Sequence, residues 1–125
     1  MKNLIIDAAT DKIFFKIISD NESYTSDYPS SSENFDKFLT LLFNFLNKNK
    51  ININEINNIF VNQGPGKFSG IRTSVSVAKA LNFTNKLNLY GFDSELVKNQ
   101  NYDKIIDLFN KGLLIKNLIK PQYSS

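Results

Sequence analysis

The sequence predicts an α/β domain with a mixed sheet of five strands, in the order strand, strand, strand, helix, strand, helix, strand, followed by a C-terminal helix. Three observations support this fold class. Apolar residues occur in short runs of strand length, of which residues 3–7 and 13–18 are the first two. A glycine-rich turn at residues 63–70 separates another such run from a long helical segment. The 125 residues suffice for one domain with its own core, but not for two sizeable domains.

The composition excludes several kinds of site. The chain contains no cysteine and no histidine, so it offers no disulfide, no zinc–thiolate site and no serine–histidine pair. The net charge of +3 comes from fourteen lysines and one arginine, which are scattered along the chain as on an ordinary solvated surface. Neither an N-terminal signal pattern nor an apolar run of membrane-spanning length is present. We therefore expect a soluble, cytoplasmic protein.

Three strands are expected before any helix. Residues 3–7 form a continuous apolar run that ends in Asp7, which suits a central strand covered on both faces. A turn follows, and residues 13–18 form the second strand. The third strand, residues 22–28, is more polar and is expected at an edge of the sheet. Residues 19–21, Ser-Asp-Asn, are typical of a hairpin turn between the last two.

A first helix is predicted after Pro29, with Ser30 and Glu33 at the spacing of a capping box. Its apolar residues cover an arc of about 200°, roughly twice what packing on a sheet requires. One side is expected to face the sheet, and the other to need a neighbouring helix or a partner protein as its cover. Because the chain offers few helices, we favour a partner protein or self-association. The sheet side comprises Phe35, Leu39, Leu42 and Leu46, and the other side comprises Phe38, Leu41 and Phe45.

The most informative segment is the fourth strand with the turn and helix after it. Residues 59–61 are apolar, residues 63–70 read Gln-Gly-Pro-Gly-Lys-Phe-Ser-Gly, and a helix runs from Ile71 to Phe83. Such a turn places backbone N–H groups at the start of a helix, where phosphates are often bound. However, the spacing matches neither standard phosphate-binding fingerprint. Arg72, the one arginine, follows the last glycine closely, where a planar guanidinium can make contacts that lysine cannot.

The C-terminal third is expected to add a fifth strand and a helix. Residues 87–92 are predicted to form the strand, and residues 93–95 can cap a short helix. Residues 102–111 are amphipathic, and Gly112 is expected to end their helix. We therefore predict one domain over residues 1–112 and a C-terminal tail, only partly ordered, over residues 113–125.

Two motifs give the chain a family resemblance. Strand–strand–strand–helix–strand–helix–strand–helix is the plan of one lobe of the actin-like ATPase (ribonuclease H-like) superfamily, whose first hairpin carries a D-x-G-T phosphate loop. Residues 7–10 read Asp-Ala-Ala-Thr at this place, and residues 64–72 read Gly-Pro-Gly-Lys-Phe-Ser-Gly-Ile-Arg. The chain therefore resembles the TsaB (YeaZ) family, whose turn typically reads G-P-G-S-F-T-G-L-R. Lys67, Ser69 and Ile71 are mild departures from that pattern.

The resemblance weakens after residue 93. Members of the family usually continue into a second lobe of about equal size and return with a helix and a P-x-Y-L-R ending. Residues 102–111 resemble the returning helix, and Pro121-Gln122-Tyr123 resemble the ending. We therefore expect a minimal member that lacks the second lobe.

The resemblance implies a non-catalytic subunit in the formation of threonylcarbamoyladenosine in tRNA. Such a subunit binds the transferase TsaD through helices, or pairs with a second copy of itself, and allows TsaE to join; it meets tRNA only indirectly and needs neither cofactor nor metal. The resemblance also implies a degenerate phosphate loop at Asp7 and Thr10. The implied structural motif consists of Gly64, Pro65, Gly66, Phe68, Ser69, Gly70 and Arg72. The implied partner-binding residues are Phe38, Leu41, Phe45, Ser74, Val77, Ala78 and Leu81.

Two other hypotheses remain open at the level of sequence. The chain could be an enzyme, either a nucleotide hydrolase or a peptidase-like protein, that uses Asp7, Thr10 and the glycine turn. The missing histidine and cysteine weigh against it. It could also be a degenerate paralogue that only self-associates, in which case it would not bind TsaD at all.

Overall fold

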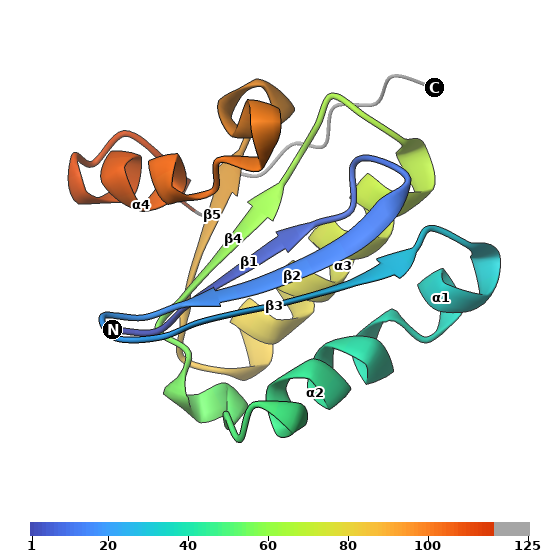
Figure 1. Ribbon diagram of the computed structural model, residues 1–125, viewed down its shortest axis with the longest axis horizontal. Helices are drawn as coiled ribbons and strands as arrows, with labels where there is room; N and C mark the ends of the chain where they lie inside the picture. Colours follow the sequence, from blue (N-terminus) through green and yellow to red (C-terminus); the bar gives the residue numbers. More distant parts are fainter. Residues whose placement is uncertain (117–125) are drawn as a thin grey trace.

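The computed structural model describes residues 1–116, which form three layers around one sheet (Figure 1). Two helices, α2 (Phe38–Lys48) and α3 (Phe68–Thr84), cover one face of the sheet. The other face carries a 3-10 helix, η2 (Ser94–Gln100), and α4 (Asp103–Asn110). Among the described residues, no helix has the length and apolar character that crossing a membrane would require.

The sheet contains six strands in the order β3-β2-β1-β4-β5-β6. β1 pairs in parallel with β4, and β4 with β5, whereas β1–β2, β2–β3 and β5–β6 are antiparallel. The predicted mixed sheet of five strands is therefore present, with one further two-residue strand within the segment expected to be a tail. The strands are β1 (Asn3–Asp7), β2 (Lys12–Ile18), β3 (Ser23–Pro29), β4 (Asn58–Asn62), β5 (Asn88–Phe92) and β6 (Ile115–Lys116).

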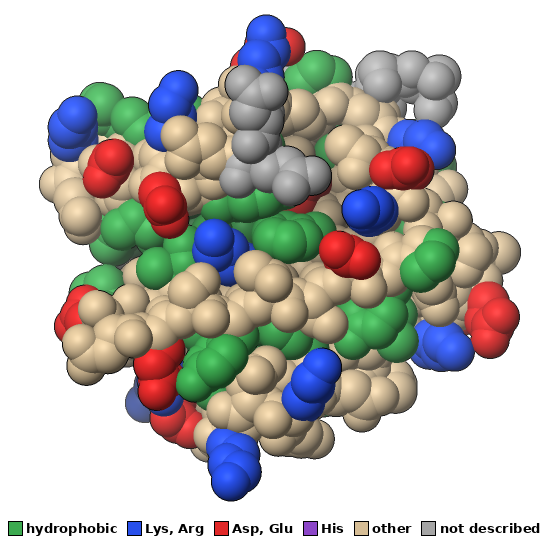
Figure 2. All heavy atoms as spheres, viewed as in Figure 1, with side chains coloured by type: hydrophobic (Ala, Val, Ile, Leu, Met, Phe, Trp, Pro, Cys, Tyr) green, Lys and Arg blue, Asp and Glu red, His purple; other side chains and the backbone are tan. Residues whose placement is uncertain are grey.

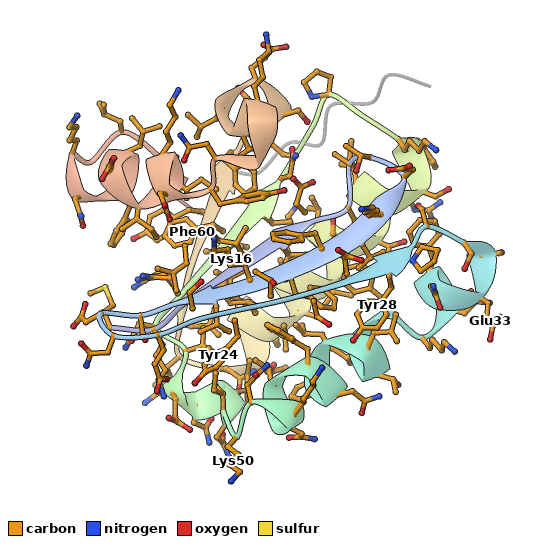
Figure 3. The ribbon with its side chains drawn as sticks, viewed as in Figure 1. Lys16, Tyr24, Tyr28, Glu33, Lys50 and Phe60 are labelled. Carbon is orange, nitrogen blue, oxygen red and sulfur yellow. The ribbon has the colours of Figure 1, made fainter. Side chains whose placement is uncertain are left out.

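Burial follows the position of each strand. Every residue of β1 and β4 is buried, as the apolar run of residues 3–7 predicts for a central strand with both faces covered. β3 alternates between exposed and half-buried residues and lies at the edge, as expected. In Figure 3, Tyr24 and Tyr28 extend from β3 toward α2, whereas Lys16 and Phe60 lie on the α4 side. The remainder of the predicted tail, with Pro121-Gln122-Tyr123, lies outside the described residues.

The first helical region begins later than predicted and is split in two. A short helix, α1 (Ser32–Asp36), precedes α2, and Lys37 interrupts them. The predicted capping box of Ser30 with Glu33 is wrong. Ser31 is the cap, because its Oγ accepts a hydrogen bond of 3.1 Å from the Asn34 N–H, while the Glu33 carboxylate forms an ion pair with Lys37 at 3.2 Å.

The orientation of α2 also differs from the prediction. Phe38, Leu41 and Phe45 are 2%, 8% and 1% exposed and belong to the core, so the expectation that a partner protein covers them is wrong. Phe15 of β2 supplies the cover that the sequence did not reveal, with its ring centroid 5.5 Å from Phe38 and 5.8 Å from Phe45. The arc is wide because α2 packs on the sheet and also against α3. Leu39, which was expected to face the sheet, is 47% exposed.

The second core lies between the sheet and α4. Aromatic rings dominate it: Phe60, Tyr90 and Phe109 contact one another at centroid distances of 5.1–5.5 Å. α4 ends as predicted, since Gly112 adopts a φ of 71° and the N–H of Leu113 donates to the Leu108 carbonyl. Figure 2 shows apolar side chains reaching the surface in a band between α4 and the β2–β3 hairpin.

Candidate functional site

The glycine turn packs directly on the hairpin between β1 and β2. A Cβ atom on Gly66 would lie 2.3 Å from the Ala9 carbonyl oxygen, and one on Gly70 would lie 1.8 Å from the Ala8 carbonyl oxygen. The N–H of Lys67 donates a hydrogen bond of 2.9 Å to the Ala9 carbonyl. Both glycines are therefore required by the close approach of two backbones. The two motifs that the sequence singled out separately form one structural unit.

This packing changes the interpretation of the turn as a phosphate site. The Lys67 N–H is already bonded within the protein, and the Gly64 N–H donates to Asn62 Oδ1 at 2.8 Å. Gly64 itself has a φ of 105°, which glycine adopts without strain. The hydroxyl of Ser94 lies 2.7 Å from the Pro65 carbonyl oxygen. The three glycines thus have a structural explanation that involves no ligand.

Asp7 is held by three donors at the C-terminal end of β1. The side chain is 5% exposed. Its Oδ1 accepts hydrogen bonds from the Ala9 N–H at 3.2 Å and from Asn62 Nδ2 at 3.0 Å, and its Oδ2 accepts one of 2.7 Å from the Tyr102 hydroxyl. Asp7 therefore has neutral partners from the hairpin, β4 and the start of α4.

Sequence reasoning missed Asn62 and Tyr102, for different reasons. Asn62 follows the apolar run of β4 just as Asp7 ends that of β1, and the parallel register brings Ile6 opposite Val61. The polar residues at the ends of two neighbouring parallel strands could therefore have been paired from the sequence. No comparable signal marked Tyr102, because it reaches Asp7 only through the path of η2 across the sheet.

Tyr102 is itself buried in an apolar setting. Its ring stacks on Phe14 with centroids 4.7 Å apart and an interplanar angle of 16°. Burial, and next the negative charge of Asp7 and the hydrogen bond to it, raise the pKa of the Tyr102 phenol far above its ordinary value. Tyr102 is therefore a permanent hydrogen-bond donor to Asp7 at neutral pH.

A cavity of about 320 Å³ opens beside this group. Asp7, Asn62 and Tyr102 line its interior, and the exposed Thr10 contributes to its wall together with Lys12, Phe14, Asp27, Ser94, Val97 and Lys98. A carboxylate offers about four acceptor positions, of which three are occupied here. The described residues also include no group of three or more carboxylates placed to hold a metal ion. The arrangement stabilises a buried carboxylate and presents little of it to a ligand.

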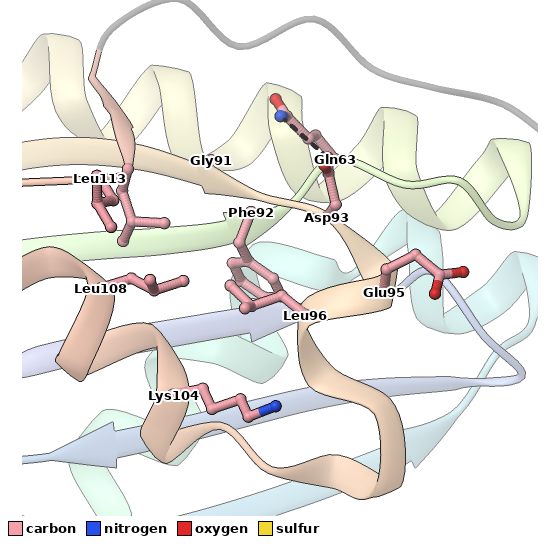
Figure 4. A pocket seen from close by; sticks show the side chains of 10 residues that line it. Gln63, Gly91, Phe92, Asp93, Glu95, Leu96, Lys104, Leu108 and Leu113 are labelled. Carbon is pink, nitrogen blue, oxygen red and sulfur yellow. Dashed lines mark hydrogen bonds between the residues drawn. The ribbon is translucent and has the colours of Figure 1, made fainter.

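A second cavity, of about 420 Å³, lies between β5, η2 and α4 (Figure 4). Phe92, Leu96 and Leu108 form apolar parts of its wall, and Gln63 contributes at the strand end. Gln63 Nε2 donates to Asp93 Oδ1 at 3.4 Å, while its buried Oε1 has no hydrogen-bond partner among the described residues. Apart from Gln63, the first residue of the glycine turn, this cavity contains none of the residues predicted for catalysis or partner binding.

The predicted partner residues lie mostly inside the domain. On α3, Ser74, Ala78 and Leu81 are buried, and the Ser74 hydroxyl donates to the Ile71 carbonyl at 3.1 Å. With Phe38, Leu41 and Phe45, six of the seven thus have too little exposed surface to carry an interface, and only Val77 is half-buried. The physical reason is that α2 and α3 bury their small and apolar faces against the sheet and each other. Burial of these six residues therefore contradicts the partner-binding role that the family resemblance implied for them.

Arg72 and Phe68 lie on the outer side of α3. The Arg72 guanidinium carbon lies 5.8 Å from the centroid of the Phe68 ring, a cation–π arrangement within one helical turn. Ser69 is exposed beside them. Within the predicted structural motif, Gly66 and Gly70 contact the hairpin, whereas Gly64 and Pro65 hydrogen-bond with Asn62 and Ser94. Phe68, Ser69 and Arg72 are exposed.

Comparison with known proteins agrees with this fold. A family model described as TsaD: tRNA N6-adenosine threonylcarbamoyltransferase matches residues 30–97. YeaZ from Pseudomonas aeruginosa superposes with a TM-score of 0.72 at 15% sequence identity, over 89% of this chain and 50% of that one. This likeness confirms the predicted α/β fold, one lobe of the actin-like (ribonuclease H-like) type.

Two curated relatives are proteins of tRNA modification. The chain is 28% identical over 91 residues to the tRNA threonylcarbamoyladenosine biosynthesis protein TsaB of Buchnera aphidicola subsp. Schizaphis graminum, covering 73% of this chain and 43% of that protein. It is 42% identical over 43 residues to the TsaB of Buchnera aphidicola subsp. Baizongia pistaciae, covering 34% of this chain and 20% of that protein. The chain thus spans less than half the length of these relatives.

Proposed function

The chain belongs to the family described as TsaD, tRNA N6-adenosine threonylcarbamoyltransferase, with TsaB (YeaZ) proteins among its relatives, and on this premise we propose that it is a non-catalytic partner subunit of TsaD. In this role it takes part in the formation of threonylcarbamoyladenosine in tRNA. It binds TsaD through its helices and so allows TsaE to join. Its contact with tRNA is indirect, through the assembly.

The main support for this proposal is that the Asp7 carboxylate is buried and hydrogen-bonded within the protein. In an enzyme of this fold, the first hairpin would present its carboxylate to a nucleotide or metal. Here the Asp7 carboxylate accepts three hydrogen bonds from the protein, and Tyr102 and Phe14 lie over it as a stacked pair. The glycine turn is likewise engaged by the Ala8 and Ala9 carbonyls. Both features support a scaffold in which the former phosphate loop stabilises the fold.

The surface proposed for binding lies on the solvent side of the two helices below the sheet. Leu39 of α2 is 47% exposed and Phe83 of α3 is 91% exposed, whereas most large apolar residues of these helices are buried. Val77 of α3 is half-buried and so is only partly accessible to a partner. Aromatic side chains such as that of Phe83 are enriched in the buried part of protein interfaces. We propose that this surface, and not the buried residues predicted from the sequence, contacts TsaD.

The proposal can be tested by size-exclusion chromatography with light scattering. The purified chain is run alone and mixed with the TsaD protein of the same organism. We expect a one-to-one complex, which the substitutions Leu39→Asp and Phe83→Asp should weaken by at least about tenfold in affinity. Leu113→Asp is the matched control, because Leu113 is also exposed but lies beside α4 on the other side of the sheet. Separate elution of the wild-type chain and TsaD would overturn the proposal.

The enzyme hypothesis predicts a different outcome. Purified chain would turn over ATP or a peptide, and Asp7→Asn would abolish the turnover in a variant that still folds. Such a result would replace the scaffold role. A chain that forms dimers but never binds TsaD would instead be a self-associating paralogue.

A further inference from the structure

One surface of the molecule carries charge of a single sign. Between Glu55 and Asp93 the sequence contains no acidic residue, but it contains four basic residues, Lys67, Arg72, Lys79 and Lys86. All four are exposed. They begin just before α3, continue along it and end just after it. The outer face of α3 is therefore basic, although the charges of the whole chain looked scattered in the sequence.

Two of the four residues, Arg72 and Lys79, lie inside α3 and are seven residues apart, which is close to two helical turns and about 10 Å along the axis, so they share one side of the helix. The other two flank the helix: Lys67 is its N-cap, and Lys86 follows its C-cap, Asn85. The four together are called the row below. Within residues 1–116, no carboxylate lies within ion-pair distance of any of these basic groups. Two acidic residues that precede α3 in the chain are already paired with other lysines: Glu33 pairs with Lys37, and Glu55 pairs with Lys2. The positive charge of the row is therefore directed to solvent or to a binding partner.

Apolar groups accompany the row at both ends of the helix. Phe83 is 91% exposed near the C-terminal end, and Phe68 is 42% exposed in the first turn. Ser76 and Ala80 are small and exposed between them, so another helix could approach the middle of α3 closely. Large apolar residues at both ends with small residues between them are suited to a second helix lying along the face.

From these features we propose that the outer face of α3 docks against an acidic helical face of the partner protein, and that its own charge disfavours pairing with a second copy of this chain. This inference rests on the proposed function and names the chemistry of the partner. A two-fold dimer through α3 would place the same basic row on both sides of the interface. Like charges at such close range oppose association, whereas an acidic face is attracted and oriented.

A protein face fits better than a nucleic acid. Successive bases stack on successive aromatic rings, but of the two rings beside the row only Phe83 is open, because the guanidinium of Arg72 lies over the Phe68 ring. The serine and alanine between the basic residues suit backbone approach by a helix. Binding of an RNA to this face would therefore contradict the proposal.

The test compares two charge reversals of equal size. The double variant Arg72→Glu/Lys79→Glu alters the α3 row, and the control Lys104→Glu/Lys111→Glu alters two exposed lysines at α4, across the sheet. Binding to the TsaD protein of the same organism is measured by titration at about 50 mM and about 500 mM salt. We expect the α3 variant to bind at least about tenfold more weakly and the control to bind as wild type. We also expect wild-type affinity to fall about tenfold at the higher salt concentration.

The outcomes test the acidic-face inference and the proposed function separately. If TsaD binds wild type and the α3 variant equally well, the acidic-face inference fails and the proposed function stands. If the α3 variant loses binding to a tRNA that the wild type retains, the surface binds nucleic acid and the inference fails. If TsaD does not bind the wild-type chain, the proposed function fails. A second measurement then tests whether the charge of α3 opposes pairing between two copies of the chain.

That second measurement uses disulfide formation at α3. The chain contains no cysteine, so Ser76→Cys introduces a single thiol at the exposed centre of the face. We expect the Ser76→Cys protein to cross-link to the Arg72→Glu/Ser76→Cys/Lys79→Glu protein at least about fivefold faster than either cross-links to itself, because opposite charges speed the encounter. Equal rates, or faster cross-linking of the basic form to itself, would overturn the inference.

Discussion

The hydroxyl of Tyr102 donates a hydrogen bond of 2.7 Å to Asp7 Oδ2, although the two residues are 95 positions apart in the chain. This bond joins the first strand to the start of the last helix. It also removes one acceptor position of the buried carboxylate from any ligand. The contact therefore links the stability of the α4 layer to the hairpin between β1 and β2.

We predict that Tyr102→Phe lowers the free energy of unfolding by about 1–3 kcal/mol, because a buried carboxylate loses one of its donors. Urea denaturation followed by circular dichroism measures the change. Tyr90→Phe is the matched control, since it removes a hydroxyl in the same aromatic layer and leaves the Asp7 bonds intact. Equal effects of the two substitutions would show that the hydrogen bond to Asp7 contributes little.

The raised pKa of Tyr102 predicts a loss of stability in alkaline solution. In the unfolded chain the phenol loses its proton above about pH 10, whereas in the folded protein it remains protonated. The unfolded state then binds fewer protons, so the free energy of unfolding falls as the pH rises, by about 1.4 kcal/mol per unit for this group. Below about pH 10 its stabilising contribution is fully present.

The alkaline effect is isolated by comparing wild type with Tyr102→Phe. Urea denaturation of both proteins at several values between about pH 9 and pH 12 gives the two slopes. The wild type should lose stability more steeply, and the difference between the proteins should shrink as the pH rises. Parallel slopes would show that Tyr102 does not carry this dependence.

The contact between the glycine turn and the hairpin predicts a large effect of one methyl group. In Gly70→Ala the new Cβ would meet the Ala8 carbonyl oxygen at 1.8 Å, so one backbone must move. We expect a loss of about 2–4 kcal/mol in stability. Gly112→Ala is the control: no atom lies within 4 Å of its Cβ position, and its φ of 71° should cost only about 1 kcal/mol. Thermal denaturation of the two variants gives the comparison.

The orientation of α2 can be tested with two adjacent residues. Phe38→Ala removes a buried ring that contacts Phe15 and should cost about 3–5 kcal/mol. Leu39→Ala removes a side chain that is 47% exposed and should cost at most about 1 kcal/mol. The orientation expected from the sequence would give the opposite ranking. Chemical denaturation of the two variants therefore distinguishes the two orientations directly.

Much of the fold was predictable because the signals are local. The runs at residues 3–7 and 59–61 are continuous and apolar, which marks central strands before any pairing is known. Gly112 ends α4 through its own backbone conformation, as predicted. The glycine turn was recognised from composition, although its physical cause, the approach to Ala8 and Ala9, was not.

The sequence by itself therefore determined the order of strands and helices, the place of the glycine turn and the absence of thiol and imidazole chemistry. These depend on residue type and on spacing within one element. Only the tertiary structure decided which side of α2 is buried and that Tyr102 holds Asp7. Each of these depends on how distant segments meet, and an apolar or charged pattern within one helix does not specify which neighbour will lie against it.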